Sequence, residues 1–167
     1  ILRVSIGCRM LAEAAGLPPH QVELIRYASM MHDIGKIGVA DRILLKPMKL
    51  TPDEFEEIKT HCQYGVDIIG DHPADVTQMA RDIAYTHHEC WDGKGYPRGL
   101  QGEAIPIVGR ITAIIDVYDA LTTTRSYRGA MSHEEALARM SETSHWWRRE
   151  IFEAFMRTVG VLEALAA

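Results

Sequence analysis

The chain has 167 residues, a length that suits one domain with its own buried core. Hydrophobic residues make up 47% and charged residues 25% of the chain, which excludes a disordered tail or a collagen-like repeat. The formal net charge of −5 argues against a broad basic surface for duplex nucleic acid. We therefore expect a globular domain that meets any anionic ligand with locally placed positive charge.

The spacing of the cysteines and the pattern of the first residues indicate the cellular compartment and the extent of the chain. Cys8, Cys62 and Cys90 lie far apart without a Cys-x-x-Cys pair, so neither a disulfide framework nor a thiolate zinc site is indicated. We find neither a membrane-spanning apolar run nor a signal-peptide pattern, and we expect a reducing, cytoplasmic setting. Because the helical pattern at Ile1 has no capping residue before it, we expect a fragment whose first helix begins further upstream.

Nearly every periodic segment has the helical period, so the sequence predicts an all-α fold. Capping boxes at Thr51–Glu54 and Ser132–Glu135 open two of the helices. Residues 40–50 are predicted to form a connecting loop or short turn. The predicted helices cover approximately residues 1–16, 19–33, 51–62, 75–87, 107–121, 132–142 and 150–160.

Residues 89–106 are too rich in glycine and proline for regular structure. Gly93, Gly95, Pro97 and Gly99 all fall within this stretch. Long structured loops in compact domains commonly carry function, so we expect this one to contribute to a site.

Candidate metal ligands lie in four segments at similar spacing along the chain. Such spacing can return each ligand to the same end of a helical bundle. Four imidazoles and two carboxylates without a thiolate favour iron or manganese over structural zinc, and six ligands exceed the need of one catalytic ion. We therefore predict two divalent ions that share a carboxylate, that of Asp33. The candidate ligands are His32, Asp33, His61, His87, His88 and Asp116.

A single histidine on an apolar face is usually a structural core residue, so each candidate alone is weak. The adjacent pair His87-His88 is harder to explain by packing, because both rings would need partners for buried nitrogens. The remaining histidines fall in cap or turn contexts and are predicted to lie at the surface; they are His20, His72, His133 and His145.

The segment His32-Asp33-Ile34-Gly35-Lys36 resembles the HD phosphohydrolase superfamily, whose signature is a His-Asp doublet on a helix. The run His87-His88-Glu89, followed by Asp92-Gly93-Lys94-Gly95-Tyr96-Pro97, resembles the extended signature of the HD-GYP family. The similarity covers about residues 3–140. It implies a single HD-GYP domain over 1–167, an HD-domain helical bundle. A metal-binding core would cover 1–121 with the glycine-rich loop at 89–106, and helices would extend the fold over 122–167.

The resemblance implies a metal-dependent phosphodiesterase that opens the bacterial second messenger cyclic di-GMP to linear pGpG, with onward hydrolysis to GMP left open. Two neighbouring metals suit an in-line displacement at phosphorus. The six candidate ligands match the family's ligand positions, and Asp33 and Lys36 are the expected catalytic residues. Tyr96 either contacts a guanine or anchors the loop. The positions expected to meet substrate phosphates are Lys36, Arg125 and Arg128.

Departures from the family pattern keep two alternatives open. The family usually supplies a Glu and a His from the first helix, just before the position of Arg3, and the chain begins too late to include them. One alternative is therefore a module that binds cyclic di-GMP or a diguanylate cyclase (GGDEF) partner without turnover. The other is a hydrolase of a related cyclic dinucleotide. The sequence also departs from the family pattern near its end, where Trp146-Trp147-Arg148-Arg149 replaces a Phe-Asp-Pro-like stretch of the family.

The resemblance also implies partners. The glycine-rich loop is expected to contact GGDEF proteins, and the parent chain is expected to carry an upstream receiver or sensor domain. The helix cut at Ile1 would be a homodimer contact in that parent chain.

Overall fold

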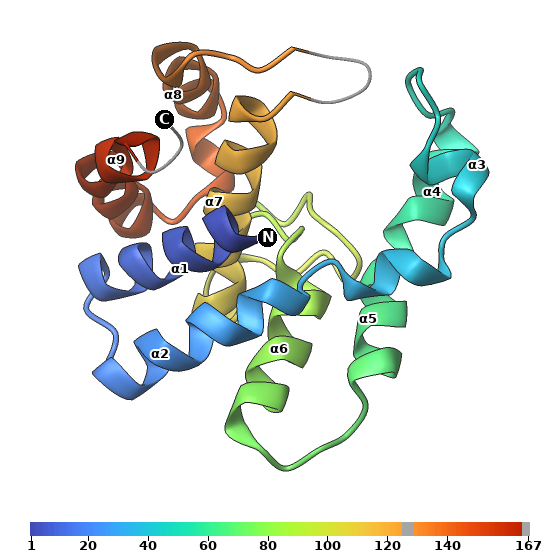
Figure 1. Cartoon of the computed structure of the whole chain (residues 1–167), viewed down its shortest axis with the longest axis horizontal. Coiled ribbons are helices and arrows are strands. Elements are labelled where there is room, and N and C mark those ends of the chain that lie inside the picture. The colour runs from blue at the N-terminus through green and yellow to red at the C-terminus, as the bar shows by residue number, and fades with distance from the viewer. Residues whose placement is uncertain (125–128, 165–167) are drawn as a thin grey trace.

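A computed structural model of the chain describes residues 1–124 and 129–164 (Figure 1). In these ranges the regular elements are α-helices and 3-10 turns, which confirms the predicted all-α fold. No helix in the described ranges is long and apolar enough to cross a membrane. The α-helices are α1 (Leu2–Ala14), α2 (Pro19–Ala28), α3 (Asp41–Leu44), α4 (Pro52–Lys59), α5 (His61–Ile69), α6 (Asp75–Thr86), α7 (Ile107–Thr122), α8 (His133–Glu142) and α9 (Arg149–Ala164). The 3-10 turns are η1 (Ser29–Met31), η2 (Ile34–Gly38), η3 (Gly102–Ala104) and η4 (Ser144–Trp146).

Helix α7 forms the centre of the core and contacts α1, α6, α8 and α9 (Figure 1). Its side chains are apolar on most faces, as expected for a helix surrounded by others. Ile111, Ile114 and Ile115 are almost fully buried, and each contributes about 1.5–3 kcal/mol through removal from water. Helices α3 and α4 lie at the edge of the molecule opposite α8 and α9 (Figure 1).

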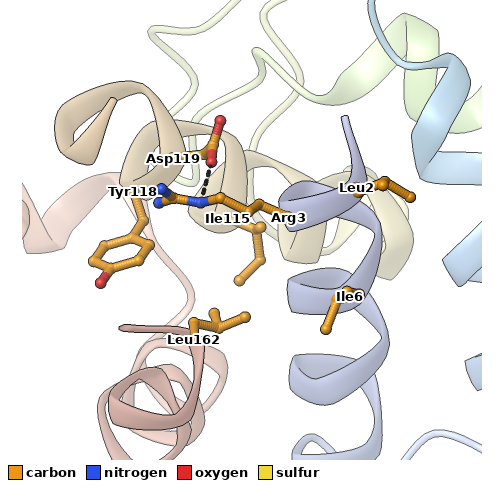
Figure 2. Close-up of a pocket in the computed structure, with 7 residues that line it drawn as sticks. All are labelled: Leu2, Arg3, Ile6, Ile115, Tyr118, Asp119 and Leu162. Carbon is orange, nitrogen blue, oxygen red and sulfur yellow. Dashed lines mark ion pairs between the residues drawn. The ribbon is translucent and has the colours of Figure 1, made fainter. Parts of the chain in front are cut away.

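Helix α1 is fastened to α7 by an ion pair and by close packing. Arg3 Nε lies 2.9 Å from Asp119 Oδ1, and Arg3 Nη2 donates to Thr122 Oγ1 at 2.6 Å. Gly7 lets the helices approach, because a Cβ there would meet Ile115 Cγ2 at 2.8 Å. Figure 2 shows the Arg3–Asp119 pair at the rim of a small apolar pocket between α1, α7 and α9.

The predicted helix over 19–33 ends early, at Ala28, and the chain continues as the tighter turn η1. The Ser29 hydroxyl donates to the carbonyl of Arg26 at 3.4 Å, and the Ser29 carbonyl accepts from His32 Nδ1 at 2.7 Å. Side-chain hydrogen bonds of this kind compete with regular α-helical winding. The prediction that one helix reaches Asp33 is therefore wrong.

The predicted helix over 51–62 is also wrong at its end, because α4 stops at Lys59 and α5 begins at His61. The break falls at Thr60, where α5 begins to pack against η2. A Cβ on Gly35 would lie 1.9 Å from the His61 carbonyl oxygen and 2.3 Å from Gly65 N, so glycine is required for this approach. This contact places His61 at the start of a helix.

The other expected helices are found with small changes. Those predicted over 1–16, 75–87, 107–121 and 132–142 are confirmed with ends shifted by one or two residues. The last helix runs from Arg149 to Ala164 and does not stop at Gly160. Val159 and Leu162 are buried on either side of that glycine, and packing of α9 on α1 keeps the helix regular.

Candidate metal centre

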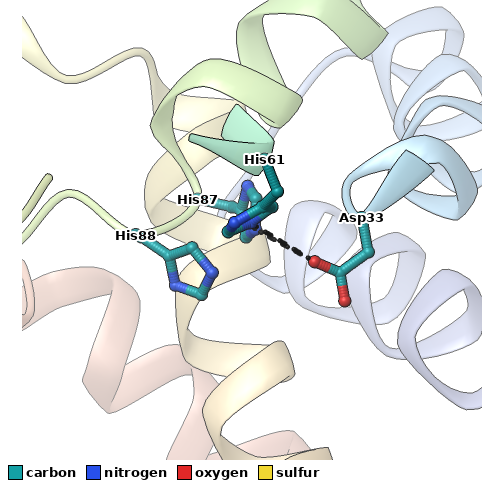
Figure 3. Close-up of side chains that lie close together, drawn as sticks. All are labelled: Asp33, His61, His87 and His88. Carbon is teal, nitrogen blue, oxygen red and sulfur yellow. Dashed lines mark hydrogen bonds and ion pairs between the residues drawn. The ribbon is translucent and has the colours of Figure 1, made fainter. Parts of the chain in front are cut away.

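Three segments that are distant in the sequence bring four candidate ligands together. Asp33 follows η1, His61 begins α5, and His87 and His88 follow α6. One ligand atom from each of the four lies within 4.8 Å of all the others. Figure 3 shows Asp33 pointing across the site toward His61 and His87, with His88 on the far side of the cluster.

Backbone carbonyls set the tautomers of three histidines. Nδ1 of His32 lies 2.7 Å from the Ser29 carbonyl, Nδ1 of His61 lies 2.6 Å from that of Ile58, and Nδ1 of His87 lies 3.0 Å from that of Ile83. A carbonyl oxygen can accept but not donate, so each Nδ1 carries the proton. In its neutral form, each ring therefore presents the lone pair of Nε2 to the centre, which is the arrangement that metal-binding histidines use.

The inner side of the cluster brings imidazole nitrogens and a carboxylate oxygen together, with the Cys62 thiol 3.7 Å from His61 Nε2. His61 Nε2 and His87 Nε2 lie 3.4 Å apart, so two lone pairs face each other. Asp33 Oδ1 lies 3.5 Å from His61 Nε2 and 3.7 Å from His87 Nε2. This oxygen is buried and has no hydrogen-bond partner. An unpaired buried carboxylate oxygen is costly. A divalent cation bound among these atoms would satisfy all three, so the residues fit a metal.

The second oxygen of Asp33 faces a different set of groups. Asp33 Oδ2 lies 3.4 Å from His32 Nε2, which is itself 3.5 Å from Asp116 Oδ1 on α7. Lys36 Nζ donates to the same oxygen at 2.5 Å. The carboxylate of Asp33 thus stands between a His61–His87 group and a His32–Asp116 group, which is the position that a shared ligand needs.

The charges of the His32 group are strongly coupled in the metal-free protein. Burial lowers the pKa of His32, but the carboxylates of Asp116 and Asp33 outweigh it and raise this pKa to about 10. Burial raises the pKa of Asp116, yet the hydrogen bond to His32 lowers it to about 2. Burial raises the pKa of Asp33, but neighbouring His32, His87 and Lys36 outweigh burial and hold this pKa well below its usual range. Without metal, a protonated imidazole is held between two carboxylates.

The pKa values of His61 and His88 are shifted in the opposite direction to that of His32. Burial lowers the pKa of His61, and burial together with neighbouring His87 lowers the pKa of His88 well below its usual value. Both imidazoles are therefore neutral near pH 7, which is the form that coordinates metals. The His88 ring also stacks on Tyr96, with ring centroids 4.7 Å apart and an interplanar angle of 28°.

The glycine-rich loop is anchored by Glu89, a role that the sequence analysis missed. The buried Glu89 carboxylate accepts from the backbone N–H of Arg98 at 2.8 Å and from that of Leu100 at 2.9 Å. Gly95 lets the loop fold back closely, because a Cβ there would lie 2.3 Å from Cys90 N. A charged residue directly after paired histidines is the signal that could have indicated such an anchor.

A pocket of about 370 Å³ opens beside the metal cluster. His87 and His88 form part of its wall, and Tyr96 and Phe55 contribute aromatic surface. Lys59 Nζ lies 4.9 Å from the Phe55 ring centroid and 5.5 Å from that of Tyr96. Lys59 Nζ also pairs with Glu56 Oε1 at 2.6 Å, so the pocket joins aromatic walls to an ion-paired lysine next to the cluster, and the aromatic surface suits a nucleotide base.

The remaining site predictions fall in different places. Lys36 contacts Asp33, and Tyr96 lies in the pocket wall. Arg125 and Arg128 lie outside the described residues. His133, predicted to lie at the surface, is instead partly buried, because its Nδ1 pairs with Tyr118 Oη at 2.8 Å.

Comparisons with known proteins agree with this architecture. The HD domain family matches residues 3–149. A 3'3'-cGAMP-specific phosphodiesterase 2 of Vibrio cholerae is 46% identical over 135 residues, which cover 81% of this chain and 26% of that protein. A cyclic di-GMP phosphodiesterase of Thermotoga maritima is 44% identical over 148 residues, which cover 88% of this chain and 40% of that protein. The chain thus spans less than half the length of these relatives.

A solved structure shares the fold. An HDG"Y"P protein of Bdellovibrio bacteriovorus superposes with a TM-score of 0.73 at 19% sequence identity, over 92% of this chain and 49% of that one. The family match covers most of the chain and includes the His-Asp doublet, the paired histidines and the glycine-rich loop. This chain therefore belongs to the HD domain family, and the residues from His87 to Pro97 place it in the HD-GYP branch of that family.

Proposed function

We propose that this domain is a metal-dependent phosphodiesterase that hydrolyses cyclic di-GMP to linear pGpG. The observation that carries the proposal is the set of facing acceptors formed by Asp33, His61 and His87, which calls for a bound cation. The adjoining pocket, whose lining includes aromatic side chains and Lys59, suits a nucleotide. The names of the Thermotoga and Vibrio relatives support a cyclic dinucleotide as the substrate class.

Two divalent ions, iron or manganese, are the proposed cofactors. Asp33, His61, His87 and His88 would hold one ion, and Asp33 would share the second with His32 and Asp116. Bound there, the ions supply Lewis-acid activation of water and of the phosphodiester. Oxygen and imidazole ligands without thiolate suit iron and manganese.

The chain's own residues orient the substrate and offset its charge. Water adds at one phosphorus, the bond from that phosphorus to the 3′ oxygen breaks, and the new ends are a 5′ phosphate and a 3′ hydroxyl. Lys36, which contacts Asp33, brings a positive charge to the reacting phosphate. Lys59 and Tyr96 hold the nucleotide in the pocket. Arg125 and Arg128 remain proposed phosphate contacts on sequence grounds.

A related cyclic dinucleotide is the second candidate substrate, because the 46% identical relative is named for 3'3'-cGAMP. The direct test compares rates on cyclic di-GMP and 3'3'-cGAMP for protein purified anaerobically, with metal content measured per chain. We expect two ions per chain, formation of pGpG, and loss of both the metal and the product in Asp33→Ala. Asp67→Ala, an exposed carboxylate on α5, is the matched control and should retain both.

Each outcome of this test has a distinct meaning. Product from Asp33→Ala at the wild-type rate would refute the assignment. Binding of cyclic di-GMP by metal-loaded wild-type protein without turnover would favour the binding-module alternative. Faster hydrolysis of 3'3'-cGAMP would transfer the proposal to that substrate.

We also propose the wider context that the HD-GYP resemblance implies. Residues 1–167 act as one domain of a longer cytoplasmic signalling protein with an upstream receiver or sensor domain. The glycine-rich loop over 89–106 contacts GGDEF partners, and the first helix contributes to a homodimer. Size-exclusion chromatography of the parent chain with and without Leu2→Asp, a change at an exposed position of the first helix, tests the dimer.

A further inference from the structure

The pocket beside the metal cluster has a wall from the far end of the chain. Trp146, in the turn η4 before α9, lines the same pocket as His87, His88 and Tyr96. This residue remains 37% exposed, although it is large and aromatic. By contrast, the neighbouring Trp147 is 5% exposed. Trp146 therefore presents aromatic surface where a ligand of the metal centre would lie.

The backbone around Trp146 is fastened to the glycine-rich loop. The Trp146 carbonyl accepts from the Trp91 N–H at 2.9 Å. Two residues after Trp146, Arg148 also contacts the loop. Its Nη1 lies 2.9 Å from Glu103 Oε1, and its guanidinium lies 5.9 Å from the Trp91 ring centroid. Contacts with the loop on both sides hold the position of Trp146 relative to the pocket.

Trp147 anchors the same turn in the core. Its indole N–H donates to the Met140 carbonyl at 3.3 Å, and its ring stacks on Phe152 with ring centroids 6.4 Å apart. Because Trp147 is fixed, the Trp146 ring, 6.0 Å away and nearly perpendicular to it, is positioned by a rigid support. The exposure of Trp146 is thus a property of an ordered turn.

Another aromatic wall of the pocket is also preorganised. Tyr96 stacks on His88 and meets the Phe55 ring edge-on, with centroids 6.0 Å apart. Lys59 lies over both the Phe55 and Tyr96 rings and is held there by its ion pair with Glu56 at 2.6 Å. A flat heteroaromatic group in the pocket could therefore contact aromatic surface from both Tyr96 and Trp146.

We infer that Trp146 is a base-stacking residue for the purine of a cyclic dinucleotide whose phosphate lies at the metal centre. This inference rests on the proposed function and deepens it by adding a binding residue from the C-terminal extension. Stacking recognises the face of a base and tolerates different bases, because every base has a π-face. Trp146 should therefore strengthen binding of guanine-containing and adenine-containing substrates by similar factors.

The test measures kinetics and equilibrium binding on the metal-loaded protein. For Trp146→Ala we expect KM for cyclic di-GMP and the dissociation constant to rise about 5- to 150-fold, the range for losing one base–aromatic stack. The value of kcat and the metal content should stay within about twofold of wild type. The KM for 3'3'-cGAMP should rise by a similar factor. Trp146→Phe retains an aromatic face and should restore most of the affinity.

Tyr27→Ala is the matched control, because Tyr27 is an exposed aromatic residue on α2 away from the pocket. It should leave KM unchanged. Circular dichroism checks that each variant folds, and Trp146→Phe keeps the test valid if the alanine variant does not.

The outcomes separate this inference from the proposed function. Unchanged KM and binding in Trp146→Ala, or no recovery in Trp146→Phe, would overturn the role of Trp146 while leaving the hydrolase intact. Binding by wild type without turnover, still weakened by Trp146→Ala, would overturn the hydrolase and support the stacking role. A wild-type protein that neither binds nor hydrolyses either dinucleotide would overturn both.

Discussion

The metal centre and the cluster of Tyr118, His133 and Glu163 both place imidazole beside a carboxylate, and they differ in how the ring nitrogens are paired. His133 Nδ1 meets the Tyr118 hydroxyl at 2.8 Å, and its Nε2 lies 3.9 Å from Glu163 Oε2. Each nitrogen of His133 thus faces a protein partner. At the metal centre, Nδ1 of His61 and of His87 is tied to a carbonyl while each Nε2 faces another acceptor.

The difference gives a criterion for separating a histidine with a structural role from a proposed metal ligand. Both are partly or fully buried and both have polar neighbours, so burial does not distinguish them. The distinguishing feature is a lone pair left facing other lone pairs, because only a cation or a proton can satisfy that arrangement. The comparison leads to four predictions.

The largest expected effect comes from removing a ligand at the metal centre. His61→Ala should lower metal affinity by more than the roughly 10- to 100-fold typical of losing an outer-shell partner, and hydrolysis should fall with it. Metal content after dialysis and equilibrium metal titration measure the effect. His133→Ala is the matched control, and equal metal loss in the two variants would break the distinction between the clusters.

A smaller effect is expected from Lys36, the protein cation that contacts Asp33. Lys36→Met should lower kcat about 10²- to 10³-fold, the range for losing one group that stabilises transition-state charge. The metal content should remain, because Lys36 offers no ligand once Asp33 and the histidines bind the ions. Single-turnover kinetics on metal-loaded protein measure the change, and an unaltered rate would remove Lys36 from the catalytic residues.

The metal-free centre should give stability a pH dependence on two sides. The lowered pKa values of Asp33 and Asp116 contribute stability above the unfolded carboxyl pKa near 3.9, which is lost as pH falls toward 2. The raised pKa of His32 contributes stability below its unfolded value near 6.5, which is lost as pH rises through 10. The free energy of unfolding should therefore be greatest between about pH 3.9 and about pH 6.5.

Urea unfolding of chelator-treated protein across this pH range tests the expectation. Asp116→Asn should reduce the loss of stability at both low and high pH, because it removes one carboxyl group with a lowered pKa and one carboxylate partner of His32. His133→Ala should leave the shape unchanged. A wild-type profile that is flat down to pH 3 would contradict the coupling of these charges.

The smallest effect is expected at the second cluster. Tyr118→Phe removes the hydroxyl that meets His133 and should cost about 1 kcal/mol of unfolding free energy, the typical net value of one hydrogen bond. Metal content and hydrolysis should not change. Urea unfolding measures the free energy, and loss of metal in this variant would link the two clusters.

The sequence by itself determined the features that depend on near neighbours. The capping boxes at Thr51 and Ser132 are present with both reciprocal hydrogen bonds, since all their atoms belong to one helical turn. The all-α class followed from the hydrophobic period, and the His-Asp doublet with the glycine-rich signature pointed to the family. The predicted roles of the metal ligands remain predictions, although the structure brings four of these residues within 4.8 Å.

Tertiary structure alone decided the features that depend on distant residues. The break between α4 and α5 follows from the approach of Gly35 to His61, and the partners of His133 come from α7 and α9. Trp146 reached the pocket through contacts with a loop far earlier in the chain. Local pattern cannot specify these placements, because each depends on which surfaces are buried together when the helices pack.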